Sequence, residues 1–323
     1  MKGLDEIRIG IIGVGLLGNL HNQAIQTIIE EPYLDDDVTV SVDAICDTRG
    51  DYVKEYADSW KIPFYFTDYH RLLELDTINA VYIATPTVSH KEIFLAAAKA
   101  GKHIFIQKPL AFFPNDIGQM IKARDENGIH VQVGHVLRQD PGFWTVRSMI
   151  HNSELREKMG KLFNIHFLSD QEKPYTGSGF HPSTWRKDKN QAHAGTLYEH
   201  SIHDFDVIHY WFGDQYRFSR VTAQTKNFFA LDGIEDSVGV LADLENISGE
   251  LGATFVLTAV WHNIHRDERH IEIFWENAHL DVRHTSLRMS GFLEIEGGKV
   301  VELNQEQMDQ EYREAIGHGF RRR

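Results

Sequence analysis

The chain has 323 residues, of which 42% are hydrophobic and 25% are charged, and its formal net charge is −14. This length and composition predict a globular protein with two domains. The acidic balance excludes a protein that binds the backbone of nucleic acids, and it disfavours an anionic membrane surface as a partner.

The beginning of the chain lacks the pattern of a signal peptide, and no apolar run is long enough to span a bilayer. The single cysteine, Cys46, excludes an internal disulfide framework and fits a reducing compartment. We therefore expect a cytoplasmic protein that acts without a membrane or a nucleic acid.

The first part of the chain alternates between short apolar runs and segments with helical spacing. Such alternation predicts βαβ units and a doubly wound parallel sheet, which is the Rossmann type of α/β fold. The predicted strands are 7–12, 38–46, 80–85, 103–107 and 130–136, and the predicted helices are 16–30, 89–101 and 114–128.

From residue 161 onward the pattern changes to successive strands joined by turns. It predicts an α+β domain with an open, mostly antiparallel sheet, one face of which packs against a long helix at 195–213. We therefore place a dinucleotide-binding domain at 1–137 and a substrate-binding and oligomerisation domain at 138–323. The predicted strands of the second domain are 161–170, 217–229, 236–246, 250–261, 270–282 and 291–297.

Residues 13–18 read GVGLLG, a G-x-G-x-x-G pattern between a predicted strand and a predicted helix. In such a turn the first glycine allows the sharp bend, the second lets the backbone approach a pyrophosphate, and the third allows close packing of helix on sheet. Leu16 and Leu17 open the helix, whose N-terminus faces the phosphates. We expect Gly13, Gly15, Leu16, Leu17 and Gly18 to bind the cofactor.

Asp47 ends the second predicted strand, where a carboxylate holds the ribose hydroxyls of NAD. Its distance along the chain from the glycines exceeds the usual ~20 residues, because an acidic insert lengthens the first crossover. We expect Asp47, Thr48 and Arg49 to line this part of the site. The carboxylate favours NAD, and Arg49 keeps NADP as the alternative. Asp43 is a rival acid, but it falls inside the strand.

Two further strand ends carry candidate residues. The predicted strand 80–85 ends in Thr85-Pro86 over the expected cofactor crevice; the alternative is a proline turn with Ser89 as a helix cap. The strand 103–107 ends at Gln107-Lys108-Pro109, and a lysine held at a rigid strand end is a candidate for chemistry.

The predicted helix 195–213 places Glu199, His203, Asp206 and Tyr210 along one stripe. These groups can exchange or orient protons, and Glu199 can fix the tautomer of His203. The alternative is a solvated stripe on an amphipathic helix. A metal site that combines these residues with His193 or His200 is disfavoured, because no metal-binding spacing supports it, and we expect no metal.

These motifs, in this order, resemble those of the Gfo/Idh/MocA family of oxidoreductases. The resemblance implies a Rossmann domain followed by an open-sheet domain, and it adds His90, Gln107 and Lys108 to the cofactor site. The matching positions are Gly13, Gly15, Gly18, His21, Thr85, Pro86, His90, Gln107, Lys108, Pro109, Arg138, Trp185, Arg186, Gly195, Leu197, Glu199, Ser201, His203 and Asp206.

The resemblance implies hydride transfer between a nicotinamide cofactor and a hydroxyl or ketone of a sugar, a cyclitol or a related polyol. Lys108, Glu199 and His203 would then be catalytic, with Glu199 replacing the family's aspartate. Many relatives are homodimers or homotetramers, which we also expect here. The substrate would contact Lys108, Arg138, Trp185, Arg186, Glu199 and His203, with Tyr175 and His181 as further candidates for the pocket.

Two other functions stay open at this point: a glycosidase that acts by transient oxidation, and a sensor that binds NAD or a sugar without turning it over. A zinc hydrolase is a more distant alternative. Gln107 stands where the family has glutamate. We hypothesise that the neutral amide lets Lys108 lose its proton more easily, the alternative being that Gln107 points away and packs.

Overall fold

The computed structural model describes residues 6–30, 38–175, 183–263, 267–284, 288–295 and 299–303. The described chain forms two compact units. The first contains the described residues of Met1–Gly134, Gly177–Trp185 and Asn190–Ala192, and the second contains the rest. Within the described residues, no helix combines the length and the apolar character that crossing a membrane requires.

The first unit is built on a six-stranded parallel sheet with the order β3-β2-β1-β4-β5-β6. Because β1 lies in the middle and the chain winds outward in both directions, this is the doubly wound Rossmann arrangement, as predicted. The strands are β1 Glu6–Ile12, β2 Thr39–Cys46, β3 Phe64–Phe66, β4 Ala80–Ile83, β5 His103–Ile106 and β6 Val131–Val133.

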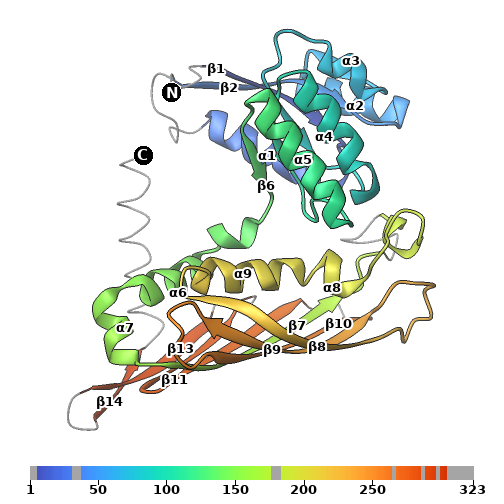
Figure 1. Ribbon diagram of the computed structural model, residues 1–323. Helices are drawn as coiled ribbons and strands as arrows, with labels where there is room; N and C mark the ends of the chain where they lie inside the picture. The colour runs from blue at the N-terminus through green and yellow to red at the C-terminus, as the bar shows by residue number, and fades with distance from the viewer. Residues whose placement is uncertain are drawn as a thin grey trace. The chain divides into compact units, whose positions relative to one another are not determined.

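Helices cover both faces of this sheet (Figure 1). The buried residues that join them to the strands are Val53 and Tyr56 of α2 on one face, and Leu72 of α3, Phe94 of α4 and Met120 of α5 on the other. The helices are α1 Leu16–Glu30, α2 Gly50–Trp60, α3 Tyr69–Leu73, α4 His90–Lys99 and α5 Pro114–Asn127, with a 3-10 turn, η1 Thr87–Ser89, before α4.

The second unit is built on an eight-stranded sheet with the order β14-β13-β12-β11-β7-β10-β9-β8. Neighbouring strands are antiparallel except β7 and β10, which are parallel. The mostly antiparallel sheet is therefore confirmed. The strands are β7 Leu162–Glu172, β8 Tyr216–Lys226, β9 Ser237–Asn246, β10 Ala253–His262, β11 Glu268–Trp275, β12 Ala278–Arg283, β13 Arg288–Ile295 and β14 Lys299–Leu303.

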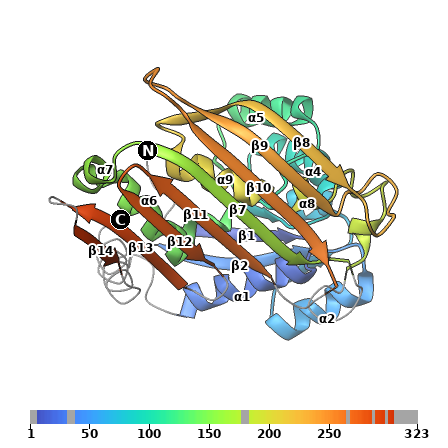
Figure 2. The same cartoon turned by 90° about the horizontal axis from the view of Figure 1, so that it is seen from below.

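One face of this sheet packs against helices, and Trp211, Phe143 and Phe255 form the centre of the core between them. Figure 2 looks onto the opposite face, where the strands lie in front of the helices. The helical elements are η2 Val136–Gln139, α6 Pro141–His151, α7 Ser153–Met159, η3 Trp185–Lys187, α8 Thr196–Glu199 and α9 Ile202–Phe212.

Three predicted elements differ from the structure. The helix predicted at 195–213 is divided into α8 and α9, with His200 and Ser201 between them. The strand predicted at 270–282 is a hairpin of β11 and β12, and the strand predicted at 130–136 is confined to β6.

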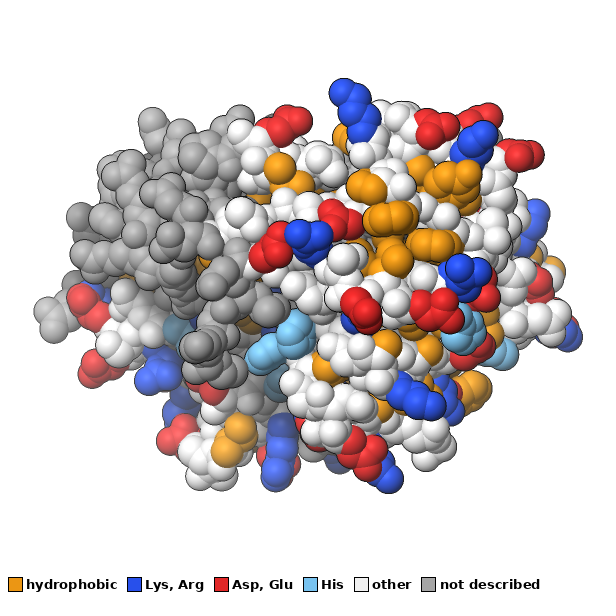
Figure 3. Space-filling model, turned by 90° about the horizontal axis from the view of Figure 1, so that it is seen from above, with side chains coloured by type: hydrophobic (Ala, Val, Ile, Leu, Met, Phe, Trp, Pro, Cys, Tyr) orange, Lys and Arg blue, Asp and Glu red, His pale blue; other side chains and the backbone are white. Residues whose placement is uncertain are grey.

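On the described surface seen in Figure 3, acidic and basic side chains are interspersed.

Candidate functional site

The glycine-rich turn between β1 and α1 has the geometry that its sequence predicts. Gly13 has a φ of +90° and its N–H donates to the carbonyl of Cys46 at 2.8 Å. A Cβ at Gly13 would lie 2.7 Å from the carbonyl oxygen of Ala84, and a Cβ at Gly18 would lie 2.0 Å from that of Gly13. Both positions therefore require glycine, because any side chain would collide with backbone.

The second glycine of the turn differs from the other two. A Cβ at Gly15 would meet no atom within 4 Å, so this position borders open space at the start of α1. Backbone N–H groups at a helix N-terminus bind phosphates, and a glycine lets a diphosphate approach them closely. The turn thus fits a dinucleotide.

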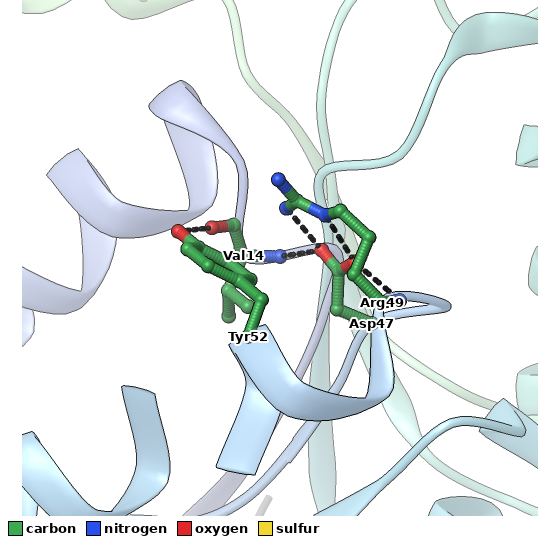
Figure 4. Close-up of polar contacts among 4 residues, drawn as sticks. All are labelled: Val14, Asp47, Arg49 and Tyr52. Carbon is green, nitrogen blue, oxygen red and sulfur yellow. Dashed lines mark hydrogen bonds and ion pairs between the residues drawn. The ribbon is translucent and has the colours of Figure 1, made fainter. Parts of the chain in front are cut away.

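Asp47, at the end of β2, is joined to this turn by hydrogen bonds (Figure 4). Its Oδ2 accepts from the Val14 N–H at 3.2 Å. Its carboxylate also binds Arg49, with Nε at 2.8 Å from Oδ1 and Nη2 at 2.8 Å from Oδ2. The Tyr52 hydroxyl donates to the Val14 carbonyl at 2.8 Å, and the Arg49 guanidinium lies 4.0 Å from the centre of the Tyr52 ring.

These contacts favour the charged forms of both Asp47 and Arg49. Burial of the Asp47 carboxyl would by itself raise its pKa, but the hydrogen bonds from Arg49 and Val14 outweigh that effect and hold the pKa below its usual range. The hydrogen bond to Asp47 raises the pKa of Arg49. The Asp47 Oδ1 also accepts from the Arg49 N–H at 3.1 Å. These four hydrogen bonds use the about four lone-pair positions of the carboxylate, so a ribose hydroxyl that binds Asp47 would replace one of the donors.

Cys46 ends β2 immediately before Asp47 and is buried. Burial and the neighbouring carboxylate raise the pKa of its thiol to about 12. The thiol is therefore neutral near pH 7, and we assign Cys46 to packing.

We predict that Asp47→Asn narrows the preference for NADH over NADPH by about 10-fold, because a charged acceptor for the ribose hydroxyls is lost and its repulsion of a 2′-phosphate disappears. Titration of both cofactors, followed by intrinsic fluorescence, measures the two affinities. Asp43→Asn is the matched control, since Asp43 lies within β2 and pairs with Arg8 of the neighbouring strand β1. An unchanged ratio in Asp47→Asn would show that another group governs the preference.

The loops that follow β4 and β5 are joined by His90, at the start of α4. This side chain is 1% exposed. Its Nδ1 lies 2.9 Å from the carbonyl oxygen of Pro109 and its Nε2 lies 3.0 Å from that of Thr85. His90 thereby fixes the Thr85-Pro86 loop relative to the segment after Lys108. The Lys108–Pro109 peptide bond is cis.

The alternative role considered for Ser89, a side-chain cap of the following helix, is not observed. Ser89 stands at the N-cap position of α4 without a side-chain hydrogen bond to the helix. Its hydroxyl donates instead to the Pro86 carbonyl at 2.8 Å and lies 2.9 Å from the Thr85 hydroxyl. It therefore stabilises the loop itself.

We predict that His90→Leu lowers the free energy of unfolding by roughly 2 kcal/mol or more, because a buried carbonyl oxygen loses its donor and the polar link between the two loops is lost. Affinity for NADH should fall with it, since the two loops lose their link. Urea denaturation measures the first effect and fluorescence titration the second. His70→Leu, which removes an exposed imidazole of the same unit, should leave both unchanged. If the two variants behave alike, His90 has no such role.

Gln107 is 5% exposed, and its amide lies among aromatic side chains. The Nε2 group donates to the Tyr82 hydroxyl at 2.5 Å and lies 2.8 Å from Nε2 of His21. The His21 ring nitrogen that faces this N–H accepts from it when the ring carries its proton on Nδ1. Burial lowers the pKa of His21, which fits the neutral ring.

We predict that Gln107→Glu raises the pKa of His21, because a carboxylate at this position favours the imidazolium. In the wild type the lowered pKa means that stability present above pH 6.5, the ordinary value, is lost as the pH falls toward the folded-state pKa. In the variant the sign reverses, and protonation of His21 adds stability. NMR titration of the histidine Cε1–H signals, assigned with His21→Gln, measures the shift. An identical His21 titration would contradict the role assigned to Gln107.

In the second unit, Glu199 closes the short helix α8. Its side chain is fully buried, and its Oε2 binds Nε of Arg186 at 3.0 Å. The start of α8 is held by Glu235, whose carboxylate accepts from the N–H groups of Gly195 at 2.8 Å and Leu197 at 2.9 Å. A Cβ at Gly195 would lie 1.7 Å from the Glu235 carbonyl oxygen, which explains the glycine.

His203 lies in the first turn of α9 and is 8% exposed. His135 packs edge-on against it, with 6.0 Å between ring centres. Asp206, one turn further on, lies 3.5 Å from Nδ1 of His135. Arg138 binds the same carboxylate through Nε at 2.8 Å and Nη2 at 2.6 Å, and this bond raises the pKa of the guanidinium.

The third acid of the α8–α9 segment faces the sheet. Asp204 is fully buried, and its Oδ1 binds Nε of Arg269, on β11, at 2.8 Å. Together with Arg186–Glu199 and Arg138–Asp206, this pair matches each carboxylate of α8 and α9 described here with an arginine. Each pair is a charge-assisted hydrogen bond, the strongest class in proteins.

The remaining residues proposed for the substrate pocket lie in different parts of the chain. Trp185 and Arg186 lie in η3. Tyr175 is buried against Trp261, and burial raises the pKa of its hydroxyl to about 12. His200 accepts from the Trp261 indole N–H at 2.5 Å. His181 lies outside the described residues.

Several residues at these sites were not predicted from the sequence, among them Tyr52, His135 and Glu235. Tyr52 and His135 stand close in sequence to predicted site residues, so the aromatic side chain near Arg49 and the imidazole near Arg138 were available signals. Glu235 carried no local signal, because it acts on a segment 38–40 residues earlier in the chain.

Two family profiles match this chain. One, described as an oxidoreductase family with an NAD-binding Rossmann fold, covers residues 7–135, and the other, the GFO/IDH/MocA C-terminal domain, covers residues 143–281. With the glycine turn and the doubly wound sheet, the first match defines an oxidoreductase with an NAD-binding Rossmann domain. The two matches together show that the chain belongs to the Gfo/Idh/MocA family.

Individual relatives agree with this assignment. The chain is 28% identical to the Bacillus subtilis oxidoreductase YrbE over 271 residues, which are 83% of this chain and 71% of that protein. It is 25% identical to the myo-inositol 2-dehydrogenase of Thermotoga maritima over 275 residues, 83% of this chain and 72% of that one. Levoglucosan dehydrogenase in complex with NADH and L-sorbose shares the fold, with a TM-score of 0.78 and 21% identity over 93% of this chain and 80% of that one.

Proposed function

We propose that this protein is an NAD-dependent dehydrogenase that interconverts a hydroxyl and a ketone on a sugar, a cyclitol or a related polyol. The observation that carries the proposal is the setting of His203. This imidazole lies on a segment whose carboxylates, Glu199, Asp204 and Asp206, are each bound by an arginine. An imidazole is the usual general acid–base group near neutral pH.

NAD, when bound, supplies the acceptor of the hydride for oxidation and its donor for reduction. In the proposal, His203 takes the proton of the substrate hydroxyl. Lys108 donates a hydrogen bond to the same oxygen and stabilises the charge that develops there. Glu199, held by Arg186, favours the imidazolium that His203 becomes. For the reverse reaction His203 returns the proton.

Polar side chains of the second unit suit a polyhydroxylated substrate. Arg138 and Arg186 have five N–H donors each in a fixed fork, and the bonds to Asp206 and Glu199 fix their orientation. Such donors suit vicinal hydroxyls. Trp185, beside Arg186, supplies an apolar surface for the ring carbons of a sugar. The relatives that carry inositol and levoglucosan in their names guide the choice of compounds to test.

The protein is incubated with NAD and a panel that contains inositols, levoglucosan and free hexoses, and NADH absorbance and product are both measured. We expect net NADH in step with a ketone product. We also expect His203→Ala and Lys108→Ala to cut turnover by about 10²–10⁴-fold, because each removes a group that acts on the reacting oxygen. NADH affinity should stay within a few-fold.

His209→Ala is the matched control, since His209 is an exposed imidazole on the same helix. It should turn over like the wild type. Product without net NADH would replace this proposal with a redox-neutral reaction such as transient oxidation of a glycoside. Full turnover in His203→Ala would exclude the mechanism. Binding without turnover of any compound of the panel would favour a sensor.

A further inference from the structure

Among the polar side chains of the β11–β12 hairpin on the sheet face opposite the core, four offer metal-ligating atoms close together, and Arg283 lies beside them with its Nε 3.5 Å from Oδ1 of Asp281. Strand alternation places them there, because the residues between them, such as Ile271 and Leu280, are buried in the core under the helices. The four side chains are between 19% and 35% exposed: His270 and Glu272 of β11, and His279 and Asp281 of β12.

Two of the four are carboxylates that face each other directly, since Glu272 pairs with Asp281 in the antiparallel register. Like charges at directly opposed positions destabilise a sheet. Each acid has an imidazole beside it. Nε2 of His270 lies 2.8 Å from Oδ2 of Asp281, and Nε2 of His279 lies 3.6 Å from Oε1 of Glu272.

Three of these side chains bring atoms that can bind a metal close to one another. One ligand atom each of His270, Glu272 and Asp281 lies within 4.8 Å of the other two. In a tetrahedral zinc site with bonds of about 2.1 Å, neighbouring ligand atoms are about 3.4 Å apart. Small rotations of side chains at the surface of the hairpin suffice to reach that distance.

His279 supplies a second, independent observation. Its Nε2 is buried and makes no hydrogen bond to any residue that the structure describes. Its ring is held by stacking on Phe274, with 4.6 Å between ring centres and 23° between planes. A buried imidazole nitrogen that makes no hydrogen bond, with only the Glu272 carboxylate 3.6 Å away, carries a desolvation cost, which coordination to a cation would remove.

We propose that His270, Glu272, Asp281 and His279 bind a divalent transition-metal ion of the zinc class, which links β11 to β12 on the open sheet face. Two imidazoles with two carboxylates suit zinc and its neighbours, whereas magnesium and calcium prefer oxygen ligands alone. Four protein ligands from two rigid strands indicate a structural site. It is separate from the proposed dehydrogenase chemistry, and neither depends on the other.

The test uses the full chain without an affinity tag, treated with EDTA and then freed of it. Calorimetry with Zn²⁺ should give one strong site per chain, and Co²⁺ should give the visible bands of a four-coordinate ion. His270→Gln and Asp281→Asn should each weaken Zn²⁺ binding by about 10-fold or more. His279→Phe keeps the stacking on Phe274 and removes the nitrogen, and it should also weaken binding. Zn²⁺ should raise the Tm of the wild type more than that of these three variants.

His70→Gln is the matched control, because His70 is also an imidazole paired with one carboxylate, Asp68 at 2.9 Å. It should bind Zn²⁺ like the wild type. NADH titration shows that each variant is folded, and molar mass is measured in parallel. The proposal is overturned if the wild type lacks a stoichiometric site, if binding survives His270→Gln and Asp281→Asn, if His70→Gln weakens it equally, or if Ca²⁺ binds in preference to Zn²⁺.

Discussion

Three arginine–carboxylate pairs hold the segment that carries His203, and the second unit depends on them. The arginines come from three distant places: Arg138 in η2, Arg186 in η3 and Arg269 in β11. The pairs Arg186–Glu199 and Arg269–Asp204 are largely buried, and a buried ion pair that loses one partner costs about 3–5 kcal/mol, because the other charge is then left without compensation. Arg138 is 37% exposed, so its pair with Asp206 contributes less. The position of the α8–α9 segment therefore depends above all on η3 and β11, which fix the surroundings of the imidazole.

In the first unit, the residues of the candidate cofactor site are positioned by a different constraint, which is the common direction of the parallel strands. Because β1, β2, β4 and β5 are parallel, the turn at Gly13, Asp47, the Thr85 loop and Lys108 all follow strand ends on one edge. Hydrogen bonds then tie neighbouring loops in pairs, Asp47 to the glycine turn and His90 to the two loops beside it. Both units thus rely on polar contacts between segments remote in sequence.

That dependence explains which features the sequence analysis could predict. The alternation of strands and helices, the glycine turn and the open antiparallel sheet follow from local patterns, and all were recognised. The division between α8 and α9 was missed, because apolar and polar residues keep a helical spacing across His200 and Ser201. Helix α2 was missed because Arg49 provides no side-chain cap, and β3 because it has only three residues. The arginine partner of each acid could not be predicted, since no local pattern links Asp204 to Arg269.

The parallel pairing of β7 with β10 also bears on how the chain folds during synthesis. β7 is made early in the second unit, yet both of its neighbours, β10 and β11, begin after residue 250. Until they emerge from the ribosome, the whole of β7 is an unpaired edge with Phe163 and Leu168 on it. An edge of this kind attracts strands of other chains. Expression at reduced temperature, or with a chaperone that covers nascent strands, should therefore raise the yield of folded protein, because β7 of the second unit is then less exposed to strands of other chains.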